Sequence, residues 1–225
     1  MKTKLLFSVG ILSLFALQLQ AQDRTQLNAM NTQISDNLDL RAVASIFGES
    51  HNLQDFERRL NDPKIQISNL DLNNDNQVDY LRVVESIENQ THLVVIQAVL
   101  DRDVYQDVAT IDLERDRYNK VNIQVVGNST LYGINYIYEP VYYTTPSIFS
   151  LFWTTNYRPY YSSWSWNYYP KYYFAWNPFP IYKYRKNISI CLNTNNRYNQ
   201  VNYRSSRRVE FSKNYNTYPR YTYSS

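Results

Sequence analysis

A run of short oxygen-bearing side chains lies between Asp71 and Asp79, in the order Asp-Leu-Asn-Asn-Asp-Asn-Gln-Val-Asp. Positions 1, 3, 5 and 9 of this run carry side-chain oxygens, from Asp71, Asn73, Asp75 and Asp79. Ca²⁺ binds six to eight oxygen atoms, and calcium loops supply them from alternate side chains and from a backbone carbonyl at position 7. Gln77 would supply that carbonyl. The spacing therefore predicts a loop that binds calcium as a structural cofactor.

The nine residues resemble the calcium loops of EF-hands, dockerins and integrin-type propellers, and they depart from them at two positions. Position 6 is Asn76, where those loops prefer glycine, and Asn tolerates the left-handed conformation that the turn requires. Position 12 is Arg82, where an EF-hand has a bidentate glutamate, so helix–loop–helix geometry is disfavoured. The alternative is a plain hairpin turn, because Asn and Asp readily bond their own backbone.

Aromatic residues are concentrated in the second half of the chain. Between Tyr132 and Tyr184 lie 14 of the 23 tyrosines and all four tryptophans, which are Trp153, Trp164, Trp166 and Trp176. Tyrosine and tryptophan stack on sugar rings and cations, and both suit membrane interfaces. Because large apolar patches mark interaction sites, we expect the tryptophans to form a binding surface for an envelope component or another envelope protein. The alternative is that these rings pack on the domain itself.

Enzyme motifs are absent from the sequence, which has no Gly-rich phosphate loop, no Gly-x-Ser-x-Gly elbow and no His-Glu-x-x-His. Carboxylate pairs such as Asp112 with Glu114 are expected to be solvated, and His51 and His92 are expected at the surface. The single cysteine, Cys191, has no base nearby in sequence to activate it. We predict a non-enzymatic binding or structural protein. The alternatives are an enzyme acting on envelope glycan and a glycan-binding module that uses the aromatic segment.

The first 21 residues have the pattern of a secretory signal peptide. Lys2 and Lys4 form its basic end, Leu5 to Leu17 its apolar run, and Ala21 its cleavage site. Cleavage there predicts a periplasmic or secreted protein. The apolar run is shorter than the ~20 residues of a transmembrane helix, so we expect no membrane span, although peripheral membrane contact stays open. Nucleic acid is not an expected partner of an exported protein.

Charge divides the chain into two parts. Residues 22–139 contain 10 Lys and Arg against 19 Asp and Glu, for a net charge of −9, whereas residues 140–225 contain 11 against 1, for a net charge of +10. We expect an α+β domain at 22–139, an aromatic Tyr/Trp/Pro-rich segment at 140–186 and a basic, disordered Asn/Tyr/Arg/Ser-rich tail at 187–225. Electrostatics allows the tail to dock on its own domain or on an anionic envelope component.

Two short helices are predicted before the strands. Asp39 is a typical N-cap, and the residues after it repeat with helical spacing: Leu40, Val43, Ala44 and Phe47, with Gly48 as a stop. Asn52 caps the second helix, whose apolar stripe is Leu53, Phe56 and Leu60 and which ends at Asn61-Asp62-Pro63. Helices this short need a sheet to pack on.

Six β-rich runs follow, at Lys64 to Leu72, Val78 to Ser86, His92 to Val99, Gln106 to Glu114, Lys120 to Val126 and Leu131 to Tyr138. Their short polar connections favour antiparallel hairpins. We predict an α+β fold in which two short helices cover one face of an antiparallel five- or six-stranded meander. An aromatic, Pro-interrupted and largely irregular tail follows it.

Most of residues 38–180 resembles a group of exported proteins of Gram-negative bacteria. The resemblance lies in the leader, Phe56 to Pro63, Asn69 to Val84, Gln106 to Ile111 and the Tyr/Trp/Pro-rich tail. It implies a domain followed by a tail, located in the periplasm or at the envelope, and it implies no activity.

Overall fold

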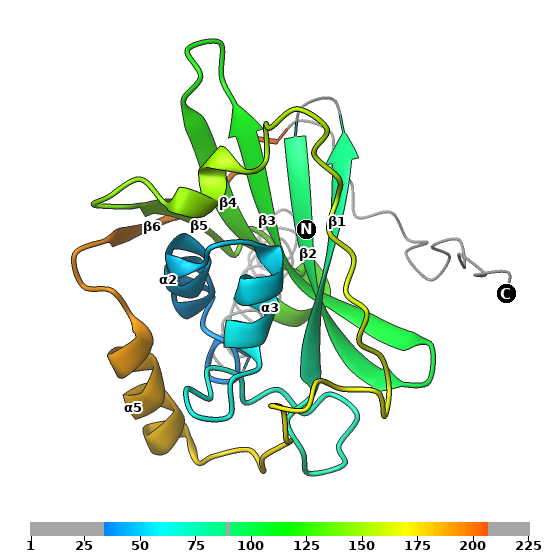
Figure 1. Ribbon diagram of the computed structural model, residues 1–225. Helices are drawn as coiled ribbons and strands as arrows, with labels where there is room; N and C mark the ends of the chain where they lie inside the picture. Colours follow the sequence, from blue (N-terminus) through cyan, green and yellow to red (C-terminus); the bar gives the residue numbers. More distant parts are fainter. Residues whose placement is uncertain (1–33, 89–90, 207–225) are drawn as a thin grey trace, which may run out of the picture.

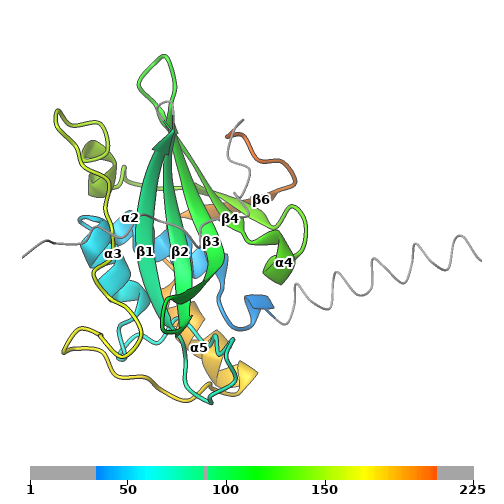
Figure 2. The ribbon, with the colours of Figure 1, turned by 90° about the vertical axis from the view of Figure 1, so that its right-hand side faces the viewer.

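The computed structural model describes residues 34–88 and 91–206, so the predicted signal peptide at 1–21 lies outside the described residues. The chain forms a six-stranded antiparallel sheet in the order β1 to β6, with helices against one face (Figures 1 and 2). The strands are β1 (Tyr80–Glu88), β2 (Thr91–Asp101), β3 (Val104–Arg115), β4 (Val121–Gly127), β5 (Ile137–Val141) and β6 (Arg197–Val201). The helices are α2 (Leu40–Glu49), α3 (Leu53–Leu60), α4 (Ser129–Tyr132), η1 (Ser147–Ser150) and α5 (Ile181–Cys191). The predicted α+β meander with two covering helices is confirmed.

The caps of α2 and α3 form as predicted. The Asp39 carboxylate accepts a hydrogen bond from the backbone N–H of Arg41, and the Asn52 side chain accepts one from Asp55. These bonds satisfy N–H groups that a helix start leaves without partners. The apolar stripes of both helices are buried against the inner face of the sheet, where Phe47 meets Phe56 edge to face at 5.2 Å between ring centroids.

Gly48 does not end α2, which continues to Glu49 and is capped by Ser50. The structure gives a different reason for glycine at this position. A Cβ atom built on Gly48 would lie 2.2 Å from the ring of Tyr142, whose hydroxyl donates a hydrogen bond of 2.8 Å to the carbonyl of Ala44. Glycine here allows the chain after β5 to lie directly on the helix.

Strands β1 to β4 form three hairpin ladders near their predicted positions. Their side chains alternate between the two faces of the sheet, as the period of two requires. The inner face carries the main core, including Leu81, Val83, Val94, Ile96 and Ile111. The outer face carries a small separate cluster of Val84, Leu93 and Val95, each about 1% exposed.

Two predicted strands are wrong in whole or in part. Residues 64–72 form no ladder strand, because Gln66 takes a left-handed φ of 55° and the N–H groups of Ile65 and Gln66 bond the carbonyl of Asp62 in a turn. A single bridge joins Ser68 to Leu38. The run from Leu131 to Tyr138 begins inside α4, since Asn128 caps that helix by accepting the N–H of Thr130. Only its end enters β5.

The predicted disorder of residues 187–225 is wrong for the part that the structure describes. Residues 142–180 are largely irregular, as expected, but α5 follows them and β6 then pairs with β5 from Ile137↔Val201 to Val141↔Arg197. Residues 207–225 lie outside the described part. No helix among the described residues is long and apolar enough to cross a membrane.

We expect Gly48→Ala to lower the free energy of unfolding by about 1–3 kcal/mol, because the added methyl group overlaps the Tyr142 ring. Helix propensity alone predicts the opposite sign, a gain of about 1 kcal/mol. Urea unfolding of the variant measures the change. Gln54→Ala, at an exposed position of α3, is the control and should shift stability little. A more stable Gly48→Ala variant would contradict the close packing of Tyr142.

Candidate functional site

The predicted calcium residues lie in one loop between the α3 region and β1. The Asp71 carboxylate accepts hydrogen bonds from the backbone N–H of Asp75 at 3.1 Å and of Asn76 at 3.0 Å, and Asp75 accepts one from Gln77 at 2.8 Å. Asn73 accepts a further bond from the Asp75 N–H. Asn76 takes a φ of 64°, which is the left-handed conformation expected where calcium loops have glycine.

Asp79 lies at the base of this loop and is only 6% exposed. Its carboxylate accepts the backbone N–H of Leu72 at 2.7 Å. Burial raises the pKa of the Asp79 carboxyl to about 7 against the effect of that bond, and the carboxylates of Asp71 and Asp75 add to the rise. Within residues 34–88 and 91–206, no three carboxylate, imidazole or thiol side chains form a metal-binding cluster. The predicted ligand set also uses Asn73 and the Gln77 carbonyl, so calcium binding stays a prediction.

The four tryptophans do not form one surface. Trp176 is 7% exposed, and its indole N–H donates to the carbonyl of Ser68 at 3.2 Å, so its predicted role in a binding surface is wrong. Trp153 is partly buried against His92, at 5.1 Å between ring centroids, and its buried indole N–H has no hydrogen-bond partner within residues 34–88 and 91–206. Trp164 and Trp166 are half-buried, and Trp164 alone of these two lines a hollow described below.

Glu57 of α3 is a buried carboxylate that ties the aromatic segment to the domain. It is 1% exposed and accepts four hydrogen bonds, from Tyr80 (2.8 Å), the Val83 N–H (3.0 Å), Tyr160 (3.1 Å) and Ser162 (2.7 Å). Burial raises the pKa of Glu57, and these four donors act against the rise. Two of the donors come from the aromatic segment, so that segment satisfies a carboxylate that the helix brings into the core.

A second buried carboxylate, Glu85 of β1, holds the segment a few residues earlier. One oxygen lies 2.7 Å from Nδ1 of His92, and the other accepts the Tyr157 hydroxyl at 2.6 Å and the Tyr160 N–H at 3.0 Å. His92 is 3% exposed and is surrounded edge-on by Phe152, Trp153 and Tyr157, so its predicted surface position is wrong.

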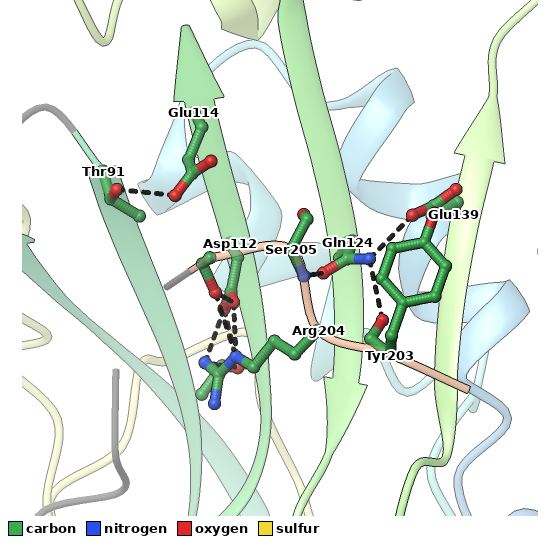
Figure 3. A network of polar contacts seen from close by, with 10 residues as sticks. Thr91, Asp112, Glu114, Gln124, Glu139, Tyr203, Arg204 and Ser205 are labelled. Carbon is green, nitrogen blue, oxygen red and sulfur yellow. Dashed lines mark hydrogen bonds and ion pairs between the residues drawn. The ribbon is translucent and has the colours of Figure 1, made fainter. Parts of the chain in front are cut away.

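The basic end of the described chain is also bound to the acidic domain. Arg204 crosses the outer face and pairs with Asp112 of β3, with Nε 2.6 Å from the carboxylate, and Ser206 donates to the same group (Figure 3). Asp112 is 2% exposed, so the prediction that it is solvated is wrong. Arg185 of α5 pairs with Asp36 at 2.9 Å. Docking of the tail on its own domain is therefore observed for Arg204, and Arg185 forms a similar contact from the end of the 140–186 segment.

Sequence periodicity contained signals for both glutamates. Glu57 falls four residues after Leu53 and three before Leu60, on the apolar stripe of its helix. Glu85 follows Leu81 and Val83 at the period of two that marks the inner face of β1. A carboxylate on a buried stripe predicts a buried acceptor that needs donors from elsewhere.

Two adjoining hollows lie between α3 and the aromatic segment, and we call them together the α3 groove. Both are lined by Asn52, Gln54 and Tyr160. The first, of about 250 Å³, adds Asp55, Glu57, Arg58, Trp164 and Tyr172. The second, of about 300 Å³, is more apolar and adds Leu53, Ile148, Leu151, Phe152, Tyr157, Arg158, Pro159 and Tyr161. The Tyr160 hydroxyl donates a hydrogen bond to Glu57, and this bond fixes the Tyr160 ring where the two hollows meet.

Asp55 and Glu57 line the same hollow, but their bonds differ from those of a catalytic pair. The Asp55 carboxylate accepts bonds from Arg58 and Arg59, and these partners lower its pKa although burial acts in the opposite direction. Both oxygens of Glu57 already accept two hydrogen bonds each, so it acts as a structural acceptor. Burial raises the pKa of the half-buried Cys191 thiol, which disfavours a reactive thiolate.

No protein-family model, curated protein or solved structure matches this chain.

We expect Ser162→Ala to lower the free energy of unfolding by about 1–3 kcal/mol at neutral pH, because Glu57 loses a donor while it remains buried. Ser163→Ala is the matched control, since the adjacent Ser163 is exposed. Equal effects of the two variants in chemical unfolding would contradict the role of the Glu57 bond.

The pH dependence gives a second readout of the same variant. Because the native pKa of Glu57 is raised, its contribution to stability is highest below the unfolded value of ~4.3 and falls as pH rises through the native value. Removing a donor raises the native pKa further. The loss of unfolding free energy in Ser162→Ala, relative to the native chain, should therefore be larger at about pH 8 than at about pH 4.

Proposed function

We propose that this protein is an exported, non-enzymatic binding protein of the bacterial envelope and that its α3 groove binds a glycan. The observation that carries the proposal is the lining of the groove. Tyr160, Trp164 and Tyr172 line it together with the amide of Gln54 and the charged groups of Asp55 and Arg58 on α3. Aromatic faces stack on the apolar faces of sugar rings, and amide, carboxylate and guanidinium groups bond sugar hydroxyls.

The sequence supports the proposed location of the protein. The signal-peptide pattern of residues 1–21 and the resemblance to exported proteins of Gram-negative bacteria support a periplasmic or secreted location. Fractionation of cells that produce the full chain tests this part of the proposal. A chain that stays in the cytoplasm with its first 21 residues attached would contradict it.

Trp164→Ala should weaken glycan binding at least ~tenfold, because stacking on this ring is lost. An array of bacterial envelope oligosaccharides identifies the ligand, and calorimetry with the strongest binder measures the loss. The matched control is Trp166→Ala, because Trp166 is also half-buried but does not line the groove. An array without binding, or equal losses in both variants, would refute the proposed groove.

We also propose that calcium stabilises the loop from Asp71 to Asp79. The support is that Asp71, Asn73 and Asp75 turn their oxygens toward the loop backbone. Burial is the main cause of the raised pKa of Asp79, and the neighbouring carboxylates of Asp71 and Asp75, which a cation would neutralise, add to it. A ligand that binds only the folded state stabilises it, by ~2.7 kcal/mol at a concentration of 100 times Kd.

Calcium titration during thermal unfolding tests this site on residues 22–225. The melting temperature should rise with calcium in the native chain and should not respond in Asp75→Ala. Asp116→Ala is the control, because Asp116 accepts similar turn bonds from Tyr118 and Lys120 in a different loop. If the melting temperature did not rise at millimolar calcium, the proposed calcium site would be refuted.

A further inference from the structure

The ladder between β4 and β5 is shorter than the strands that form it. Only Val125↔Tyr138 and Val126↔Ile137 are in register, and the Gly127 N–H extends the pairing to the carbonyl of Tyr136 at 2.9 Å. On its other side, β4 pairs with β3 along its whole length, as far as Arg115↔Val121. Pro140 follows on β5 and has no N–H to donate, so the ladder ends there.

The end of this ladder leaves part of a strand edge unpaired. Backbone groups alternate between the two neighbours of a strand, and Gly127 points its N–H toward β5. Ile123 and Val121 have the same parity as Gly127, so their N–H and C=O groups point to the same side. Among the described residues, neither has a ladder partner on that side.

A hollow of about 710 Å³ lies along this edge, and its size is typical of ligand sites, ~300–1,000 Å³. In Figure 1, β6 runs at a steep angle to β4, as expected where the sheet opens. The hollow has two chemically different walls. The outer wall is polar and includes Asn122, Gln124, Glu139 and Tyr203, of which the last three lie together in Figure 3. The inner wall is apolar and includes Val121, Tyr142 and Phe149.

The charge of the outer wall is negative. Glu139 accepts a bond from Gln124 at 2.7 Å, and Glu114, which also lines the hollow, accepts one from Thr91 at 3.0 Å. Neither carboxylate forms an ion pair with a Lys or Arg among the described residues. Lys120 also lines the hollow, but it pairs with neither carboxylate. A ligand with basic groups would therefore complement the charge of this wall.

We propose that the hollow binds an extended peptide segment of a partner protein, which adds to the free edge of β4. An added strand points alternate side chains to opposite faces, so one set meets the polar outer wall and the other meets the apolar inner wall. The segment that fits alternates basic with apolar residues. The unpaired N–H and C=O groups of Val121 and Ile123 can form hydrogen bonds with the backbone of an added strand, so this edge favours a peptide ligand. This site is separate from the α3 groove and does not depend on the glycan proposal.

Selection from a library of random decapeptides displayed on phage, with the full mature chain immobilised, tests the proposal. Enriched peptides should alternate basic and apolar residues. A synthetic copy methylated on its backbone nitrogens should bind at least ~tenfold more weakly than the unmethylated peptide, because methylation removes the donors of an added strand. No enrichment, the result expected if a second copy or the chain's own residues fill the hollow, would overturn the proposal. Equal binding of the methylated peptide would overturn it too.

Two substitutions locate the binding. Asn122→Trp places a large side chain at the outer wall and should abolish binding, whereas Asn199→Trp puts the same residue on an exposed position of β6 outside the hollow. Glu139→Gln keeps the side-chain size but removes the charge, and it should weaken the binding of peptides with basic residues ~3- to 10-fold. If Asn199→Trp abolished binding and Asn122→Trp did not, the peptide site would lie elsewhere and the proposal would be wrong.

Discussion

Buried carboxylates need hydrogen-bond donors, and this requirement connects the two halves of the chain. Glu57, Glu85 and Asp112 are each 6% exposed or less, and an unsatisfied carboxylate at such a depth would cost several kcal/mol. The acidic half supplies only part of their donors. Tyr157, Tyr160 and Ser162 supply the remaining hydrogen-bond donors to Glu57 and Glu85. Arg204 and Ser206 supply those to Asp112. The tyrosine-rich, basic segment is therefore a structural part of the fold.

The opposite net charges of the two halves fit this arrangement. Within residues 140–206 the sequence has no Asp or Glu, and the described ion pairs that leave this segment run to Asp36 and Asp112 of the acidic half. The Asp112 pair is almost fully buried, whereas Arg185 is largely exposed, and an exposed pair contributes at most ~1 kcal/mol. Specific buried bonds rather than overall charge attraction hold the segment, so the contact should persist at high salt.

Local patterns predicted the elements whose partners are close in sequence. Helices α2 and α3 followed from caps and stripes, and β1 to β4 followed from alternation and short turns. The prediction of a strand at 64–72 was wrong because Gln66 adopts a left-handed conformation, which its residue type does not indicate. Strand β6 and the burial of Trp176 were not predicted, for another reason. Their partners, β5 and Ser68, lie about 60 and 108 residues away, and composition does not report such pairing. The turn propensity of Asn and Asp predicted the bonds to the loop backbone, and calcium binding there stays a prediction. The α3 groove requires the fold to be known.

Both proposed binding sites have walls from both halves of the chain. Tyr160 and Trp164 line the groove together with residues of α3, and Tyr142 and Tyr203 line the hollow together with residues of β4. Deleting the C-terminal segment would remove one wall of each site and would also take away some of the hydrogen-bond donors of Glu57, Glu85 and Asp112. Such a deletion changes stability and binding together. Single substitutions at exposed wall positions separate the two effects, because they leave the buried carboxylates and their donors intact.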